Sequence, residues 1–109
     1  MSLYPDYIKE RLGNEILETD KGFAIYRFTD EKTVYIVDIY VKPEHRRHGV
    51  ASDIADHIEE LARGRGCTSM LGSVVASANG STDSIRVLLA YGMKVISSGQ
   101  DFILFRKEI

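Results

Sequence analysis

Residues 34–51 read VYIVDIYVKPEHRRHGVA, and their character changes in the middle of this stretch. Residues 34–41 are nearly all apolar and rich in β-branched and aromatic side chains, as in a strand that is covered on both faces. Residues 42–48 form a basic loop that leads to Gly49. Apolar residues then recur at a spacing of three to four, which is typical of a helix. The stretch therefore predicts a central strand, a loop and a helix in succession.

The helix after Gly49 is predicted to be amphipathic. Its apolar side chains fall on one face, and its acidic side chains lie away from that face. The apolar set is Val50, Ile54, Ile58 and Leu61, and the acidic set is Asp53, Asp56, Glu59 and Glu60. Gly64 and Gly66 end this helix.

Apolar, β-rich segments also precede the central strand. Residues 16–17 and 23–28 are separated from each other and from that strand by turn-forming residues, which predicts an antiparallel meander. Before them, Pro5 and Gly13 bracket a short helix over residues 6–12.

The downstream elements complete an α/β fold. Residues 67–76 have strand composition, interrupted by a glycine, and residues 95–97 and 102–106 predict a closing hairpin. Between them, a second helix starts near residue 81 and stops at Gly92. Its inward side chains are predicted to be Ile85, Leu88 and Leu89. The fold class is α/β with a mixed sheet, in one domain over residues 1–109.

Length, charge and cysteine content narrow the class of protein. A chain of 109 residues is long enough for one core and too short for two. A net charge of −2 argues against nucleic acid as the main partner. No apolar run approaches the roughly 20 residues that span a bilayer, and the first residues lack the pattern of a signal peptide. With Cys67 as the single cysteine, we expect a cytoplasmic protein with neither an internal disulfide nor a membrane partner.

A strand, a basic glycine-bearing loop and a helix start are an arrangement that binds phosphate groups. The first N–H groups of a helix have no partner inside it, and the helix dipole favours an anion there. Gly49 permits backbone geometry that other residues resist, and the small Ala51 and Ser52 let a pyrophosphate come close. Positive charge and further donors come from Arg46, Arg47 and His48. A solvated basic turn is the simpler alternative, and a nucleotide-binding module is a weaker one, because the loop lacks the lysine and the serine or threonine of a P-loop.

The residues around this loop resemble the signature of the GNAT superfamily of N-acetyltransferases. Val41 and Pro43 match its Val-x-Pro strand end. Its Arg/Gln-x-x-Gly-x-Gly/Ala loop is matched by Arg46, Gly49 and Ala51. The later elements follow in the family's order, so the resemblance covers about residues 23–107. It implies a mixed, mostly antiparallel sheet with a cofactor helix after the central strand and a second helix before the C-terminal strands.

The resemblance also implies an activity and a cofactor. The expected enzyme is an acyltransferase that moves an acetyl group from acetyl-CoA to a primary amine, of a small molecule or a protein, by direct attack. The pantetheine arm would pair with backbone groups of Ile39, Tyr40 and Val41, although plain core packing also explains these side chains. The pyrophosphate would be held by Arg46, Arg47, His48, Gly49, Val50, Ala51 and Ser52. Asn79 or Ser81 would reach the pantetheine end.

The catalytic residues of the family are not matched. Many relatives have a tyrosine four residues before the glycine that ends the last helix, and here that residue is Leu88. Tyr91, next to Gly92, is interpreted as a packing residue. The relatives' glutamate on the following strand has no counterpart, because residues 68–76 contain no carboxylate. Asp38 on the central strand is therefore the candidate base, and a structural hydrogen-bond acceptor there is equally consistent with the sequence.

Two functions of different classes follow. We favour the enzyme, because backbone polarisation and proximity can carry acyl transfer without a dedicated acid. The alternative is an acetyl-CoA-binding or interaction module with little or no catalysis. No metal site is expected, since the three histidines have no ligand-like spacing to Cys67, which is interpreted as a small buried apolar residue.

The segment before residue 16 is expected to bear on assembly. Relatives usually have a strand and two helices there, whereas this sequence predicts about one short helix. An open sheet edge and face would favour a homodimer, with an apolar contact surface made by Tyr4, Tyr7, Ile8 and Leu12. The alternative is that the short helix folds back and covers its own sheet.

Overall fold

The computed structural model describes residues 3, 6, 9, 13–77 and 81–109, and for residues 81–84 it describes the backbone only. Within these residues, six strands form one sheet in the order β1-β2-β3-β4-β6-β5. The strands are β1 (Glu15–Glu18), β2 (Gly22–Asp30), β3 (Thr33–Val41), β4 (Ser69–Val75), β5 (Lys94–Ser98) and β6 (Phe102–Glu108). The helices are η1 (Pro43–His45), a 3₁₀ turn, and α2 (Val50–Gly64) and α3 (Ser81–Ala90).

The sheet is mixed and mostly antiparallel, as the sequence predicted. Of the six described strands, only β3 and β4 pair in parallel, and they are the two middle strands. The helix α2 connects them, because parallel neighbours need a crossover between their ends. The remaining neighbours pair antiparallel, which confirms the meander and the C-terminal hairpin.

The expected N-terminal helix over residues 6–12 lies largely outside the described residues. At its end, the Gly13 N–H donates to the Lys9 carbonyl at 3.0 Å, and Gly13 has a φ of 71°. A glycine in this left-handed conformation is common directly after a helix.

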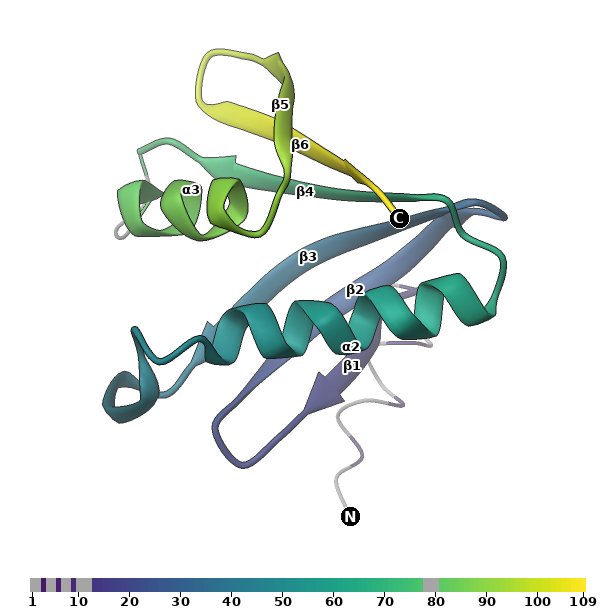
Figure 1. Ribbon diagram of the computed structural model, residues 1–109, viewed down its shortest axis with the longest axis horizontal. Coiled ribbons are helices and arrows are strands. Elements are labelled where there is room, and N and C mark those ends of the chain that lie inside the picture. Colours follow the sequence, from purple (N-terminus) through teal and green to yellow (C-terminus); the bar gives the residue numbers. More distant parts are fainter. Residues whose placement is uncertain (1–2, 4–5, 7–8, 10–12, 78–80) are drawn as a thin grey trace.

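The core lies between the sheet and the two helices, which share one face of the sheet (Figure 1). The face that α2 turns to the sheet consists of Val50, Ile54, Ala55, Ile58, Glu59 and Ala62. The prediction was wrong for Leu61, which is 47% exposed, and for Glu59, which is buried. The row spaced by four residues continues from Ile58 to Ala62, so Leu61 lies to one side of it.

The second helix, α3, contributes less to the core than predicted. Ile85 and Leu88 pack against the buried cluster, whereas Leu89 is 51% exposed. Successive residues of a helix point about 100° apart, so Leu89 turns away when Leu88 faces the sheet.

Within the described residues, the opposite face of the sheet is open, which corrects the expectation that β3 is covered on both faces. Val34 and Ile36 are buried under the helices, while Val37 and Tyr40 are 38% and 41% exposed. No helix among the described residues covers this second face (Figure 1). We call it the open face.

Candidate active site

The two middle strands diverge after a short paired stretch. Their parallel register runs from Thr33 opposite Ser69 to Ile36 opposite Gly72. Beyond this last pair, β3 continues to Val41 and β4 continues to Val75 without pairing to each other. The strands form a V that opens toward the start of both helices (Figure 1). Backbone groups at a strand edge accept an added extended chain, so the V can hold an extended ligand.

The hydrogen bonds of β2 decide which backbone groups of β3 face the V. The Lys42 N–H donates to the Lys21 carbonyl at 2.8 Å. Backbone groups of an antiparallel strand alternate between its two sides, so Tyr40 also bonds toward β2, and Ile39 and Val41 face the V. The expectation for Ile39 and Val41 is compatible with this geometry. The expectation for Tyr40 is corrected, because its backbone groups are already committed to β2.

A bulge in β3 accompanies the divergence. Ile25 faces Asp38 and Tyr26 faces Ile36, so Val37 is an extra residue without an opposite partner. A bulge bends the strand and strengthens its local twist. The bend lies where β3 leaves β4, and it explains why their pairing ends at Ile36.

The loop at the open end of the V presents free backbone donors. Arg47 and Gly49 both adopt left-handed conformations, with φ of 66° and 79°. The first helical bond of α2 runs from the Asp53 N–H to the Gly49 carbonyl at 3.0 Å. The N–H groups of residues 50–52 therefore have no acceptor inside the helix. Together with the exposed Arg47 and His48 side chains, this forms a cradle suited to an anion.

Arg46 connects the loop to the end of β3. Its Nε donates to the Val41 carbonyl at 2.9 Å, and its guanidinium lies 5.6 Å from the centre of the Tyr40 ring. These contacts hold the loop in place and use the Val41 carbonyl, which leaves the Val41 N–H for a ligand. Arg46 therefore shapes the cradle as well as adding positive charge to it.

The connection from β4 to α3 is tied to the C-terminal hairpin. The Ser77 N–H and Oγ donate to the Asp101 carboxylate at 3.0 and 2.7 Å. Asp101 precedes β6, and in the sequence it has the pattern of an ordinary turn residue. The sequence therefore did not indicate that Asp101 would bond to Ser77. Of the residues expected here, Asn79 lies outside the described residues, and Ser81 is the first residue of α3, with only its backbone described.

Asp38 lies next to the bulge and is exposed. Water can solvate its carboxylate, so it does not carry the cost of a buried charge that made it a candidate from the sequence. The observation that still supports Asp38 as a candidate base is its position beside the V.

Tyr91 is a half-buried residue directly after α3. Its hydroxyl donates to Asp56 at 2.8 Å and to Glu59 at 3.4 Å, both on α2. Burial and the hydrogen bond to Asp56 raise the pKa of Tyr91 well above its ordinary value, so the hydroxyl stays protonated. These contacts agree with the interpretation of Tyr91 as a packing residue.

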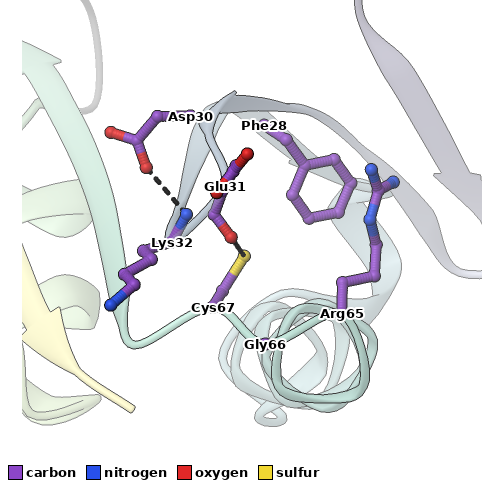
Figure 2. A pocket seen from close by; sticks show the side chains of 7 residues that line it. All are labelled: Phe28, Asp30, Glu31, Lys32, Arg65, Gly66 and Cys67. Atoms are coloured by element: carbon purple, nitrogen blue, oxygen red, sulfur yellow. Dashed lines mark hydrogen bonds between the residues drawn. The ribbon is translucent and has the colours of Figure 1, made fainter.

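A pocket of about 400 Å³ lies at the other end of α2, beside the turn between β2 and β3 (Figure 2). Figure 2 shows the Arg65 side chain against the Phe28 ring, with the guanidinium 3.8 Å from the ring centre. The Cys67 thiol donates weakly to the Glu31 carbonyl at 3.9 Å, and burial raises the pKa of this thiol. Cys67 is 5% exposed, as predicted for a packing residue. A thiol held neutral is a poor nucleophile, so Cys67 is not a candidate nucleophile in this pocket.

Two further observations concern other classes of site. Among the described residues, no group of three or more His, Cys, Asp and Glu side chains is placed to hold a metal ion. In the same part of the chain, no helix is long and apolar enough to cross a membrane.

Residues 13–92 match the family model described as the acetyltransferase (GNAT) family. The chain belongs to this family. Thialysine N-epsilon-acetyltransferase from Bos taurus is 29% identical over 91 residues, which are 80% of this chain and 52% of the relative. The Mus musculus enzyme of the same name is 24% identical over 99 residues, 91% of this chain and 56% of the relative. The chain thus spans about half the length of these relatives.

Solved GNAT structures confirm the fold. A GNAT family acetyltransferase from Elizabethkingia anophelis with acetyl-CoA bound has a TM-score of 0.76 at 16% identity, covering 95% of this chain and 82% of the other. The acetyltransferase from Bacillus subtilis in complex with CoA has a TM-score of 0.74 at 17% identity, covering 95% of this chain and 83% of the other. At these identities the likeness concerns the fold alone.

Proposed function

We propose that this GNAT chain is an N-acetyltransferase that transfers the acetyl group of acetyl-CoA to a primary amine. The observation that carries the proposal is the V between β3 and β4, with the anion cradle of residues 47–52 at its open end. Acetyl-CoA supplies a pyrophosphate, an extended amide-bearing arm and an activated thioester. The cradle adjoins the open end of the V, just as the pyrophosphate of acetyl-CoA adjoins its pantetheine arm.

The described residues fit the pyrophosphate and the pantetheine arm. The N–H groups of residues 50–52, with Arg47 and His48, match a pyrophosphate in charge and in donors. The Ile39 backbone groups and the Val41 N–H are placed to pair with the amides of the pantetheine arm. Asn79 and Ser81 are proposed contacts at the far end of that arm.

The acceptor is proposed to be a side-chain or small-molecule amine. The support comes from the relatives, which are named thialysine N-epsilon-acetyltransferases. Asp38 is the proposed base, acting directly or through water on the ammonium group before attack. The free, buried Cys67 supports a reducing compartment, so we place the activity in the cytoplasm.

The second candidate is an acetyl-CoA-binding module with little catalysis. Leu88 favours it, because this position of the helix carries no hydroxyl to protonate the leaving thiolate. Calorimetric titration with acetyl-CoA, followed by thiol-release assays with thialysine, lysine and a panel of other amines, decides between the two. Binding with thiol release supports the enzyme, binding without release supports the module, and no binding contradicts both.

A further inference from the structure

The two hydroxyl groups of Tyr35 and Ser73 form a hydrogen bond across the closed end of the V, with their oxygen atoms 2.5 Å apart. The two residues lie on either side of the last parallel pair, Ile36 opposite Gly72. Side chains alternate along a strand, and Ile36, Gly72 and their buried neighbours face the helices. Tyr35 and Ser73 therefore point to the open face, at the point where β3 and β4 separate.

The length of β3 determines which part of a bound acetyl-CoA would lie beside the Tyr35–Ser73 pair. From Val41, beside the cradle, to Ile36, at the last parallel pair, the strand advances five residues, or about 16 Å. A fully extended pantetheine arm is of comparable length, roughly five residues of strand. An arm that starts at the cradle and lies along Ile39 consequently ends near Val37, next to the Tyr35–Ser73 pair. This step rests on the proposed function.

The chemistry of the transfer requires a proton at that end. The amine nitrogen forms a bond to the thioester carbonyl carbon, the carbon–sulfur bond breaks, and the sulfur leaves with the electron pair. Leu88 cannot protonate this thiolate, and the Tyr91 hydroxyl is bound to Asp56 on α2. A phenol held by a second hydroxyl is a suitable proton donor at neutral pH.

We propose that Tyr35, oriented by Ser73, is the general acid that protonates the leaving thiolate of coenzyme A. The Tyr35 hydroxyl gives its proton to sulfur and regains one from the ammonium product of attack, by way of Ser73 or water. The overall reaction then releases the free thiol and the acetylated amine. Tyr35 is the catalytic residue, and Ser73 is its positioning residue.

A spectroscopic experiment tests the contact without turnover. The full chain is labelled with ¹³C at the tyrosine Cζ atoms, and the Tyr35 signal is assigned by its loss in Tyr35→Phe. Coenzyme A is expected to shift this signal, whereas desulfo-coenzyme A, which lacks the sulfur, leaves it in place. Equal shifts with both compounds, or no shift with coenzyme A under saturating conditions, overturn the proposal.

Kinetics test the role. Tyr35→Phe keeps the ring, which contacts the Arg27 guanidinium at 5.4 Å, and is expected to lower kcat about 100-fold with unchanged acetyl-CoA affinity by calorimetry. Ser73→Ala is expected to lower kcat less, and it provides a second test if Tyr35→Phe folds poorly. The matched control is Tyr26→Phe, which removes a tyrosine hydroxyl from the buried face of the neighbouring strand β2.

Fluorinated tyrosines separate acid catalysis from a structural role. When phenols of graded acidity replace Tyr35, kcat should vary with that acidity, as it does for a general acid. A flat series, or a Tyr35→Phe variant within about threefold of the unaltered chain, contradicts the proposal. Failure of the unaltered chain to bind acetyl-CoA overturns the proposed function and this inference together, whereas binding with undiminished transfer by Tyr35→Phe overturns only the inference.

Discussion

The Lys107 ammonium lies 2.7 Å from a Glu59 carboxylate oxygen, although the two residues are 48 positions apart in the sequence. Glu59 is on α2 and is buried, and it also pairs with Arg63 at 3.2 Å. Lys107 is on β6, and its ammonium lies 4.0 Å from the centre of the Tyr91 ring. The contacts among Glu59, Lys107 and Tyr91 join α2, β6 and the end of α3. They fix the two helices against each other near the closed end of the V.

Replacement of Lys107 by methionine is expected to destabilise the fold. Among the described residues, the change leaves the buried Glu59 with Arg63 as its ion-pair partner. Loss of one partner of a buried pair costs about 3–5 kcal/mol, and the Arg63 contact should reduce this to about 2 kcal/mol. Urea denaturation measures the difference. The control is Glu108→Gln, the neighbouring residue on β6, whose ion pair with Arg106 is exposed and should contribute less than about 1 kcal/mol. Equal losses of unfolding free energy in the two variants would show that the Glu59–Lys107 pair stabilises the fold no more than an exposed ion pair does.

Tyr91 gives the fold a dependence on alkaline pH. Burial and the hydrogen bond to Asp56 raise the pKa of Tyr91 above the ordinary value of 10.0, so the folded state binds the phenol proton more tightly than the unfolded state. Stability from this group is therefore complete below about pH 10 and falls as pH rises above it. We expect the free energy of unfolding to decrease between about pH 10 and 12, and to decrease less steeply in Tyr91→Phe. Equal slopes of unfolding free energy against pH in the two proteins would contradict this assignment. Tyr26→Phe is the control, because burial also raises the pKa of Tyr26.

Gly49 is expected to be essential for acetyl-CoA binding. Its φ of 79° is unfavourable for a β-branched residue, and a Cβ there meets nothing within 4 Å, so the effect of a substitution arises from backbone strain and from the added side chain above the helix start. Gly49→Val should abolish binding in calorimetry while circular dichroism shows a retained fold. Gly64→Val is the control, since Gly64 ends the same helix and also has open space around it. Unchanged affinity in Gly49→Val would remove the basis for placing the pyrophosphate at this loop.

These residues also show what the sequence could predict. The strand, loop and α2 were predictable because hydrophobic periodicity and glycine positions are local properties. The pairing of Glu59 with Lys107 was not, because an acidic residue near the edge of an amphipathic stripe is usually solvated, and its burial depends on a partner from a distant strand. The Tyr35–Ser73 contact was also not predictable, because it joins two strands that are distant in the sequence. Leu61 and Leu89 were misplaced because periodicity alone fixes the apolar face of a short helix only to within one neighbouring row.

Asp38→Asn tests the proposed base. The substitution keeps the size and hydrogen-bonding capacity of this exposed side chain and removes its charge. If Asp38 accepts the amine proton, the rate should fall about 100-fold at neutral pH and recover in part as pH rises and the free amine becomes abundant. The measurement is the pH dependence of kcat/KM with a saturating concentration of acetyl-CoA. A normal rate across the whole pH range would eliminate Asp38 as the base.

The open face of the sheet is expected to be the contact surface of a homodimer. Val37, Tyr40, Val75 and Phe102 are between 38% and 50% exposed. Apolar surfaces of this kind are usually buried against a partner, because water contact with them is unfavourable. Sedimentation equilibrium over a wide concentration range should show a reversible dimer.

The segment over residues 1–13 is the proposed second half of this contact. Its apolar residues Tyr4, Tyr7, Ile8 and Leu12 lie outside the described residues, so deletion is the direct test of their part. Removal of residues 1–13 should abolish the dimer, and Tyr40→Ser on the open face should weaken it. A strict monomer with full acetyl-transfer activity would contradict the hypothesis. It would favour the alternative, in which the segment covers the sheet of its own chain, because a monomeric domain gains from burying the same apolar side chains internally.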